Sequence, residues 1–264
     1  MRSLARTLSV AILVSVSSAA SPPARAAEPP DYKLWTEILT KHYNPAKGMD
    51  YKALQANDKA KLDALRQQMA RVDVQWLSRK DQLAYWINLY NVSVVAIVVD
   101  NYPVESIRDI STDPIIRLNV FKKKSVNIKG GTLSLDAIEN KKIRDVFKDA
   151  RIHFAINCAA ESCPPIRPEP YVGARIDQQL DDQTRKFLNG PHGVKLERSG
   201  GKLTITTTKI MDWFKGDFER YQGGRRAFIH HYASPDKQKQ IEAVGNQIEL
   251  EFHEYSWKLN DASQ

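Results

Sequence analysis

Two cysteines and a histidine lie close together in the segment RIHFAINCAAESCPPIRPEP, residues 151–170. A thiolate nucleophile needs a base that takes its proton, a group that orients this base, and donors for the developing oxyanion. We identify Cys163 as the candidate nucleophile, because two prolines stiffen the loop that holds it. His153 is the candidate base, since a nearby imidazole lowers the pKa of a thiol. These two side chains predict thiol-dependent acyl chemistry, provided that the loop folds back on the histidine.

A predicted β-strand over residues 151–159 positions this chemistry. Successive side chains of a strand point to opposite faces, so His153 and Asn157 share one face. Asn157 is therefore a candidate to orient the base or to stabilise developing charge. Cys158 falls on the opposite, apolar face, where a buried thiol would be an inert core residue.

The same two cysteines also suit a structural role. Cys158 and Cys163 are five positions apart and are the only cysteines of the chain. In an oxidising compartment such a pair favours a disulfide, and a permanently oxidised pair could not serve as a nucleophile. A zinc site would need His153, both cysteines and one further ligand, and the spacing matches no standard zinc pattern. We predict no metal site, and the disulfide and the reactive thiol remain open as alternatives.

A predicted buried helix over residues 81–100 supplies further polar candidates. The stretch has no charge between its two aspartates and is apolar around most of its circumference. Asn88 and Asn91 are nearly one turn apart, so their amides share one side of the helix. Buried amides need partners. They either anchor the backbone of a neighbouring segment, or orient a base and donate to an oxyanion, which makes them candidate catalytic residues.

Four side chains are candidates for substrate binding. Trp86 and Tyr90, at positions i and i+4 of the buried helix, either pack in the core or form a platform for a substrate. Glu161 and Arg167 are charged residues that flank Cys163. Two histidines downstream of the cysteines, His231 and His253, are reserve candidates for the base.

Helices and hairpins alternate irregularly along the chain, which indicates an α+β fold. We predict a single compact domain over residues 27–264, with the buried helix packed against a mainly antiparallel sheet. Helices are expected over residues 31–44, 57–72, 134–147, 177–188 and 225–232 and after Pro235, hairpins over 125–133 and 194–206, a short segment around residues 211–214, and a last strand within 247–257.

Several motifs resemble the domain of unknown function 547 family. They comprise WINLYN at residues 86–91, LSLDAIE at 133–139, HFAINCA at 153–159 with SCPP at 162–165, and YSWKLN at 255–260. They occur in the family's order and cover roughly residues 80–260. The family has no settled activity to carry over, and proteins that resemble it are often exported bacterial domains.

Some features are also similar to the papain and transglutaminase class of thiol enzymes, in which a cysteine, a histidine and an Asn or Asp act together. Those enzymes place the histidine after the cysteine, whereas His153 precedes Cys163 here. The resemblance therefore implies a permuted arrangement or a different base.

The first 26 residues predict a cleaved secretory signal peptide. Arg2 and Arg6 precede an apolar run, and small residues end the segment at Ala26. Removal of residues 1–26 takes away three arginines and lowers the formal charge from +8 to +5. This mild basic charge is spread along the chain, so nucleic acid is not an expected partner. We predict a periplasmic or secreted protein without a stable membrane span.

The leading functional hypothesis is a periplasmic thiol-dependent hydrolase or acyl transferase that acts on an amide or ester bond of a small molecule, a peptide or a cell-envelope component. No cofactor is predicted, because the sequence has no phosphate-cradling glycine loop. The alternative hypothesis is a non-catalytic periplasmic binding or scaffold domain in which a disulfide joins Cys158 to Cys163. These hypotheses differ in the oxidation state of the two sulfurs.

Overall fold

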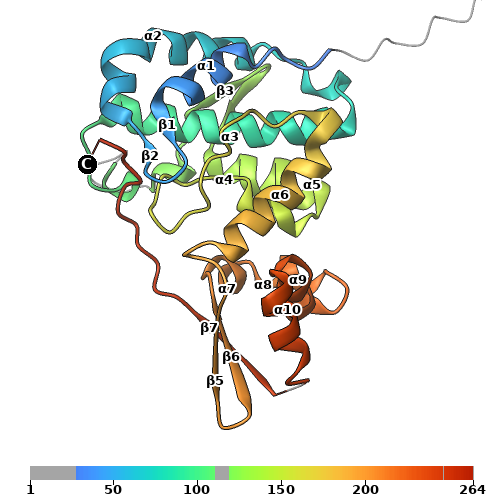
Figure 1. Ribbon diagram of the computed structural model, residues 1–264. Coiled ribbons are helices and arrows are strands. Elements are labelled where there is room, and N and C mark those ends of the chain that lie inside the picture. Colours follow the sequence, from blue (N-terminus) through green and yellow to red (C-terminus); the bar gives the residue numbers. More distant parts are fainter. Residues whose placement is uncertain (1–27, 111–118, 246, 264) are drawn as a thin grey trace, which may run out of the picture.

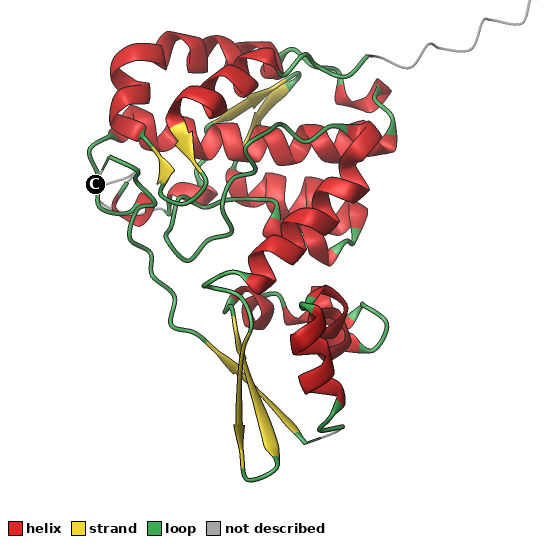
Figure 2. Ribbon diagram, in the orientation of Figure 1, coloured by secondary structure: helices red, strands yellow, loops and turns green. Residues whose placement is uncertain are grey.

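A computed structural model describes residues 28–110, 119–245 and 247–263, so the predicted signal peptide lies outside the described residues. Helices form the larger part of the molecule, and a three-stranded sheet extends from one end of it (Figures 1 and 2). The mixed helix and sheet of the α+β prediction is confirmed, with small antiparallel sheets in a compact structure. Nothing tests the single-domain boundaries, which stay a prediction.

The helices of four or more residues are α1 (Lys33–His42), α2 (Tyr51–Ala70), α3 (Arg79–Asn101), the π-helix η4 (Ile138–Arg144), the 3₁₀-helix η5 (Ala150–Phe154), α6 (Ile176–Asn189), α7 (Ile210–Trp213), α8 (Lys215–Glu219), α9 (Gly224–Tyr232) and α10 (Pro235–Glu242). Two shorter α-helices, α4 (Leu135–Ala137) and α5 (Asp145–Phe147), flank η4. The strands are β1 (Tyr43–Asn44), β2 (Gly48–Met49), β3 (Val126–Ile128), β4 (Gly131–Leu133), β5 (Lys195–Ser199), β6 (Lys202–Thr207) and β7 (Ile248–Phe252).

Helix α3 is the buried helix that the sequence predicts. Ser78 caps its first turn by accepting a hydrogen bond from the backbone N–H of Asp81 at 3.1 Å. The helix is long and apolar enough to cross a membrane, but its side chains are buried in the protein core. Its largest contact is with α2, and further contacts come from η4 and α6. The predicted packing of this helix against an antiparallel sheet is wrong, because its main neighbours among the described residues are other helices.

The three-stranded sheet combines both kinds of strand pairing. Strands β5 and β6 form the predicted antiparallel hairpin. Strand β7, the predicted last strand, adds to β6 in parallel, with Leu203 opposite Ile248. The chain then returns from the sheet to the helical part of the molecule (Figure 1). There Asn260 donates its backbone N–H to the carbonyl of Ala159 at 3.1 Å, so the C-terminal segment lies against the loop that follows η5.

The predicted strand over residues 151–159 is wrong. Residues 150–154 form η5, and an irregular loop follows. Asp149 favours this helix, because its carboxylate accepts the backbone N–H of Arg151 at 2.9 Å. The backbone of the loop bonds to side chains in place of a neighbouring strand: the amide of Asn91 bonds Ala155 and Asn157. An alternating pattern of five or six residues cannot reveal such a partner.

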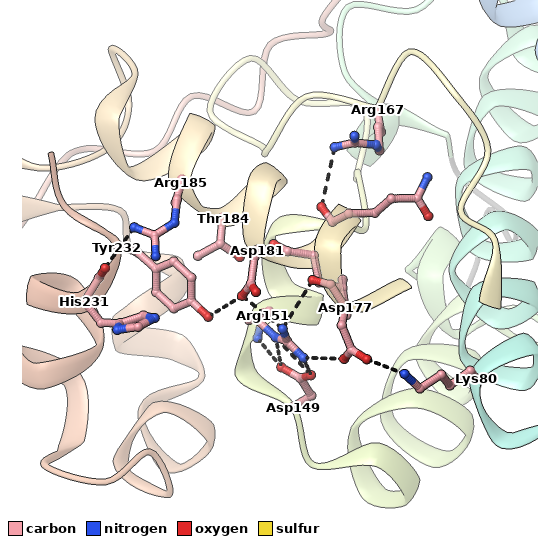
Figure 3. A network of polar contacts seen from close by, with 12 residues as sticks. Lys80, Asp149, Arg151, Arg167, Asp177, Asp181, Thr184, Arg185, His231 and Tyr232 are labelled. Carbon is pink, nitrogen blue, oxygen red and sulfur yellow. Dashed lines mark hydrogen bonds and ion pairs between the residues drawn. The ribbon is translucent and has the colours of Figure 1, made fainter. Parts of the chain in front are cut away.

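The described residues form two hydrophobic cores, one around α3 and one between the sheet and helices α6 and α9. Helix α6 takes part in both, with Leu180 in the first core and Phe187 in the second. A network of charges lies beside this helix (Figure 3). Arg151 bonds Asp149 at 2.6 Å and Asp181 at 3.0 Å, and Asp181 accepts the hydroxyl of Tyr232 at 2.7 Å. These contacts join η5, α6 and α9.

Candidate functional site

A cavity of about 230 Å³ lies where the two cores meet. Its wall comes from α3, η4, η5, the loop after η5, α7 and the C-terminal segment, which are far apart in the sequence. Both cysteines and His153 line it, so the structure brings together the three side chains that the sequence singles out for thiol chemistry. The other lining residues are mostly aromatic or apolar, with a few polar ones: Tyr90, Asn119, Phe121, Lys122, Asp136, Glu139, Ile156, Pro164, Ile210, Trp213, Phe214, Tyr255 and Trp257.

The loop after η5 carries the two cysteines and is held by Asn157. The amide of this buried side chain donates to the carbonyl of Pro164 at 2.7 Å, and its oxygen accepts the N–H of Ala159 at 2.8 Å. Ala159 has a left-handed backbone, with φ of 61°, which turns the chain back on itself. Asn157 therefore shapes the loop from within, and we assign it this supporting role in place of contact with the base.

A disulfide joins Cys158 to Cys163, with 6.1 Å between their Cα atoms. Cys163 is 8% exposed, and Cys158 is more exposed. The Sγ atom of Cys163 accepts the backbone N–H of Cys158 at 2.9 Å, and the Sγ atom of Cys158 lies 3.2 Å from the hydroxyl of Tyr255. The disulfide that the sequence left open is thus present in this structure, and in this state Cys163 is not a free thiol.

His153 is oriented by an aspartate that the sequence analysis did not identify. Its Nε2 atom lies 2.7 Å from Oδ2 of Asp217, and its ring stacks on Phe214 with 4.0 Å between the ring centroids. Burial lowers the pKa of His153, and the hydrogen bond and charge of Asp217 oppose this shift only in part. His153 is therefore a neutral imidazole at neutral pH. A histidine held by a carboxylate is the base and orienting group of a nucleophilic site.

Asp217 is itself held by cations. The guanidinium of Arg144 bonds its Oδ2 atom at 2.6 Å, and Arg220 bonds its Oδ1 atom. Burial alone would raise the pKa of Asp217, but the hydrogen bonds from His153 and Arg144 hold it well below its usual range. The carboxylate stays ionised and fixes the orientation of the imidazole.

Glu139 is a second acidic group in the cavity. It is partly buried, and burial raises its pKa to about 7, although the charge of Arg144 acts in the opposite direction. Its Oε2 atom accepts the hydroxyl of Tyr90 at 3.5 Å. A carboxyl group with such a pKa exchanges protons near neutral pH, which suits a general acid or base. The sequence places Glu139 only within the LDAIE motif and assigns it no role.

Three aromatic rings form one side of the cavity. The rings of Trp213, Tyr255 and Trp257 contact one another, with 4.7 Å between the centroids of Trp213 and Tyr255, 4.9 Å between Tyr255 and Trp257, and 6.0 Å between the two tryptophans. Trp213 is 47% exposed, which is unusual for so large an apolar side chain. Trp257 also packs beneath the guanidinium of Arg108 at 5.0 Å. These rings offer apolar surface to a ligand that enters the cavity.

Asn88 and Asn91 anchor the backbone. Asn88 exchanges two hydrogen bonds with the backbone of Tyr171, at 2.7 and 2.9 Å. Asn91 donates to the carbonyl of Ala155 and accepts the N–H of Asn157, both at 2.9 Å. Their proposed contact with the base is therefore not what the structure shows, because Asp217 takes that place. Asn91 nevertheless supports the site, since it fixes the loop that holds both sulfurs.

The four predicted substrate-binding residues lie in different parts of the molecule. Tyr90 lines the cavity, whereas Trp86 is buried beneath the ammonium of Lys142. Glu161 lines a neighbouring groove and accepts the hydroxyl of Ser256 at 2.9 Å. Arg167 bonds Glu169 and Asp182, which makes it part of a surface ion-pair group.

The reserve histidines lie elsewhere. His253 is 3.0 Å from the carbonyl of Gly193, and His231 packs on the ring of Tyr232. Among the described residues, no three histidine, cysteine or acidic side chains are grouped so that they could hold a metal ion.

Residues 74–188 match the model of a family described as "Protein of unknown function, DUF547". This segment belongs to that family. It contains α3, the disulfide loop and most of α6, while Trp213, Asp217 and the predicted YSWKLN motif lie beyond its end. No curated protein and no solved structure matches the chain.

Proposed function

We propose that the protein is an exported, non-catalytic binding domain whose cavity takes up an apolar or aromatic group of a small molecule, a peptide or a cell-envelope component. The observation that carries this proposal is the cavity itself, closed on one side by the Cys158–Cys163 disulfide. With both sulfurs bridged, the site has no thiolate nucleophile. The proposed export rests on the signal-like residues 1–26, and a disulfide is favoured in an oxidising compartment.

The aromatic wall supports binding of an apolar group. Trp213, Tyr255 and Trp257 present their rings to a cavity of about 230 Å³, which has room for a group of a few carbon atoms or one aromatic ring. Glu139 and the hydroxyl of Tyr90 add polar contacts that would select the orientation of the ligand. A cavity with apolar walls and few polar groups is typical of ligand sites.

Ligand binding is tested by titration of the purified protein with neutral aromatic and alkyl fragments, followed by amide chemical shifts. We expect shifts around the cavity and at least a tenfold weaker affinity in Trp213→Ala. Trp76→Ala is the matched control, because Trp76 is similarly exposed, at 53%, and lies outside the cavity wall. Equal affinity in both variants, or no binding of any fragment at millimolar concentration, would refute the proposal.

The second candidate function is the thiol-dependent hydrolase or acyl transferase. One observation favours it: His153, which Asp217 orients from behind, lines the same cavity as both sulfurs. In a reduced form, a free Cys163 thiol in this cavity would meet a base already held in a fixed orientation. The predicted papain-like fold belongs to this enzyme hypothesis alone, and the binding proposal does not require it.

A thiol-reactive ester separates the two functions. If the reduced protein is a hydrolase, it releases nitrophenol from p-nitrophenyl acetate in repeated turnovers, and both Cys163→Ser and His153→Ala abolish that release. If the reduced protein shows no turnover above the Cys163→Ser background, the hydrolase candidate is refuted and the binding proposal is unaffected.

A further inference from the structure

The two cysteines of the disulfide differ in exposure and in their hydrogen-bond partners. Both cysteines line the cavity, and Cys158 is partly exposed whereas Cys163 is 8% exposed. Cys158 is thus the more exposed residue of the pair, and we infer that a thiol entering the cavity attacks this end first. Access to a sulfur is one of the factors that decide which end of a disulfide is attacked.

The surroundings of Cys163 suit a leaving group. The backbone N–H of Cys158 points to the Sγ atom of Cys163 at 2.9 Å. A thiolate that forms on Cys163 keeps this donor, and a hydrogen bond to the charged form lowers a pKa. A sulfur with a lower pKa leaves faster in thiol–disulfide exchange.

The surroundings of Cys158 stabilise the thiolate that forms on this sulfur when the second thiol releases it. The hydroxyl of Tyr255 lies 3.2 Å from its Sγ atom, and a bridged sulfur has no proton of its own, so the tyrosine is the donor. Burial raises the pKa of Tyr255, which keeps that proton in place at neutral pH. Glu139 lines the same cavity, and its carboxyl is able to supply a proton near neutral pH.

From this asymmetry we propose that the Cys158–Cys163 disulfide oxidises small thiols by exchange, with Cys158 as the sulfur attacked and Cys163 as the sulfur released. A thiolate RS⁻ bonds to Cys158 Sγ, the S–S bond breaks, and its electron pair stays on Cys163. A second RS⁻ then attacks the R sulfur, which forms RSSR and frees Cys158. The two protein thiolates take up the two protons that the thiols lost. One chain thus oxidises two thiols and is itself reduced to the dithiol.

This activity goes beyond ligand binding and does not depend on the ligand proposed above. Because exchange is read from the sulfurs and binding from amide shifts, failure of one proposal leaves the other open to its own test.

The experiment uses reduced glutathione as the thiol. The folded protein is mixed briefly with glutathione, and the reaction is quenched with acid. N-ethylmaleimide then caps the sulfur that was set free, and mass spectrometry locates the glutathione and the cap. We expect glutathione on Cys158 and the cap on Cys163. The opposite placement, an equal mixture, or mixed disulfide that forms only after unfolding in urea would overturn the proposal.

A pair of variants tests the contact with Tyr255. Tyr255→Phe removes the hydroxyl but keeps the ring, and we expect roughly a 3- to 10-fold slower exchange, as loss of one hydrogen bond implies. Tyr221→Phe removes a tyrosine hydroxyl outside the cavity wall, where Tyr221 packs on Phe228, and is expected to leave the exchange rate within about twofold. Equal slowing in both variants would refute the role of Tyr255 as the donor.

Discussion

Replacement of Glu139 by Gln should stabilise the protein at neutral and higher pH but not in acid. Burial raises the pKa of the Glu139 carboxyl from 4.5 to about 7 in the folded protein. Below pH 4.5 both the folded and the unfolded chain carry the proton, so the carboxyl costs nothing. As the pH rises to 7, the unfolded chain loses its proton readily while the folded chain resists, and stability falls.

The size of the effect follows from the shift in pKa. Each pKa unit corresponds to about 1.4 kcal/mol, so the shift sets an upper bound of about 3.5 kcal/mol on the stability lost by pH 8. Because the carboxyl is only partly buried, water reduces the cost, and we expect about 1–3 kcal/mol. Glutamine has no proton to lose, so the stability of Glu139→Gln relative to the wild type should be higher by this amount at pH 8 than at pH 4.

Urea denaturation at pH 4 and pH 8 measures the difference directly. Glu254→Gln is the control, because Glu254 is exposed and its replacement removes the same formal charge. We expect the advantage of Glu139→Gln over the wild type to grow by about 1–3 kcal/mol between the two pH values, and that of the control to change by less than about 0.5 kcal/mol. A pH-independent advantage would refute the reasoning.

Three further predictions concern the supports of the cavity. Asn157→Ala should lower the free energy of unfolding by about 2–4 kcal/mol, measured in urea, because it leaves the buried polar groups of the disulfide loop without partners. The wild type should lose stability below about pH 6.5, because the unfolded chain then binds a proton that the buried imidazole of His153 disfavours. His153→Gln should remove part of this loss, and denaturation at pH 5 and pH 8 measures it. A pH profile equal to that of the wild type would contradict the prediction. Arg151→Ala should lower the free energy of unfolding by about 1–3 kcal/mol, measured by calorimetry, because several carboxylates lose the cation that they bond. Lys141→Ala, at an exposed ion pair, should lower it by less than about 0.5 kcal/mol.

Elements with strong local signals could be predicted from the sequence. Helix α3 follows from its long uncharged apolar stretch, and the hairpin of β5 and β6 from alternation around Gly200 and Gly201. The start of α2 was missed, because its cap, Asp50, lies ahead of the predicted boundary. The predicted strand at residues 151–159 failed because Asn91, on a distant helix, bonds the backbone of Ala155 and Asn157 in place of a neighbouring strand.

The candidate site was predictable only in part. Cys158, Cys163 and His153 are recognisable by residue type and by their proximity in sequence, and the structure places all three on one cavity. Asp217 could not be identified in the same way. It lies 64 positions from His153 and reaches it only through the packing of α8 against η5. The aromatic wall depends likewise on the return of the C-terminal segment from the sheet.

The oxidation state of the two cysteines in cells tests the account most directly. Cells that export the protein are treated with iodoacetamide before lysis, and the tryptic peptide of residues 152–175 is then weighed without reduction. We expect one internally bridged peptide in which neither Cys158 nor Cys163 carries an alkyl group. A peptide that is mostly alkylated on both sulfurs would contradict a bridged resting state, because the cavity that His153 lines would then hold free thiols.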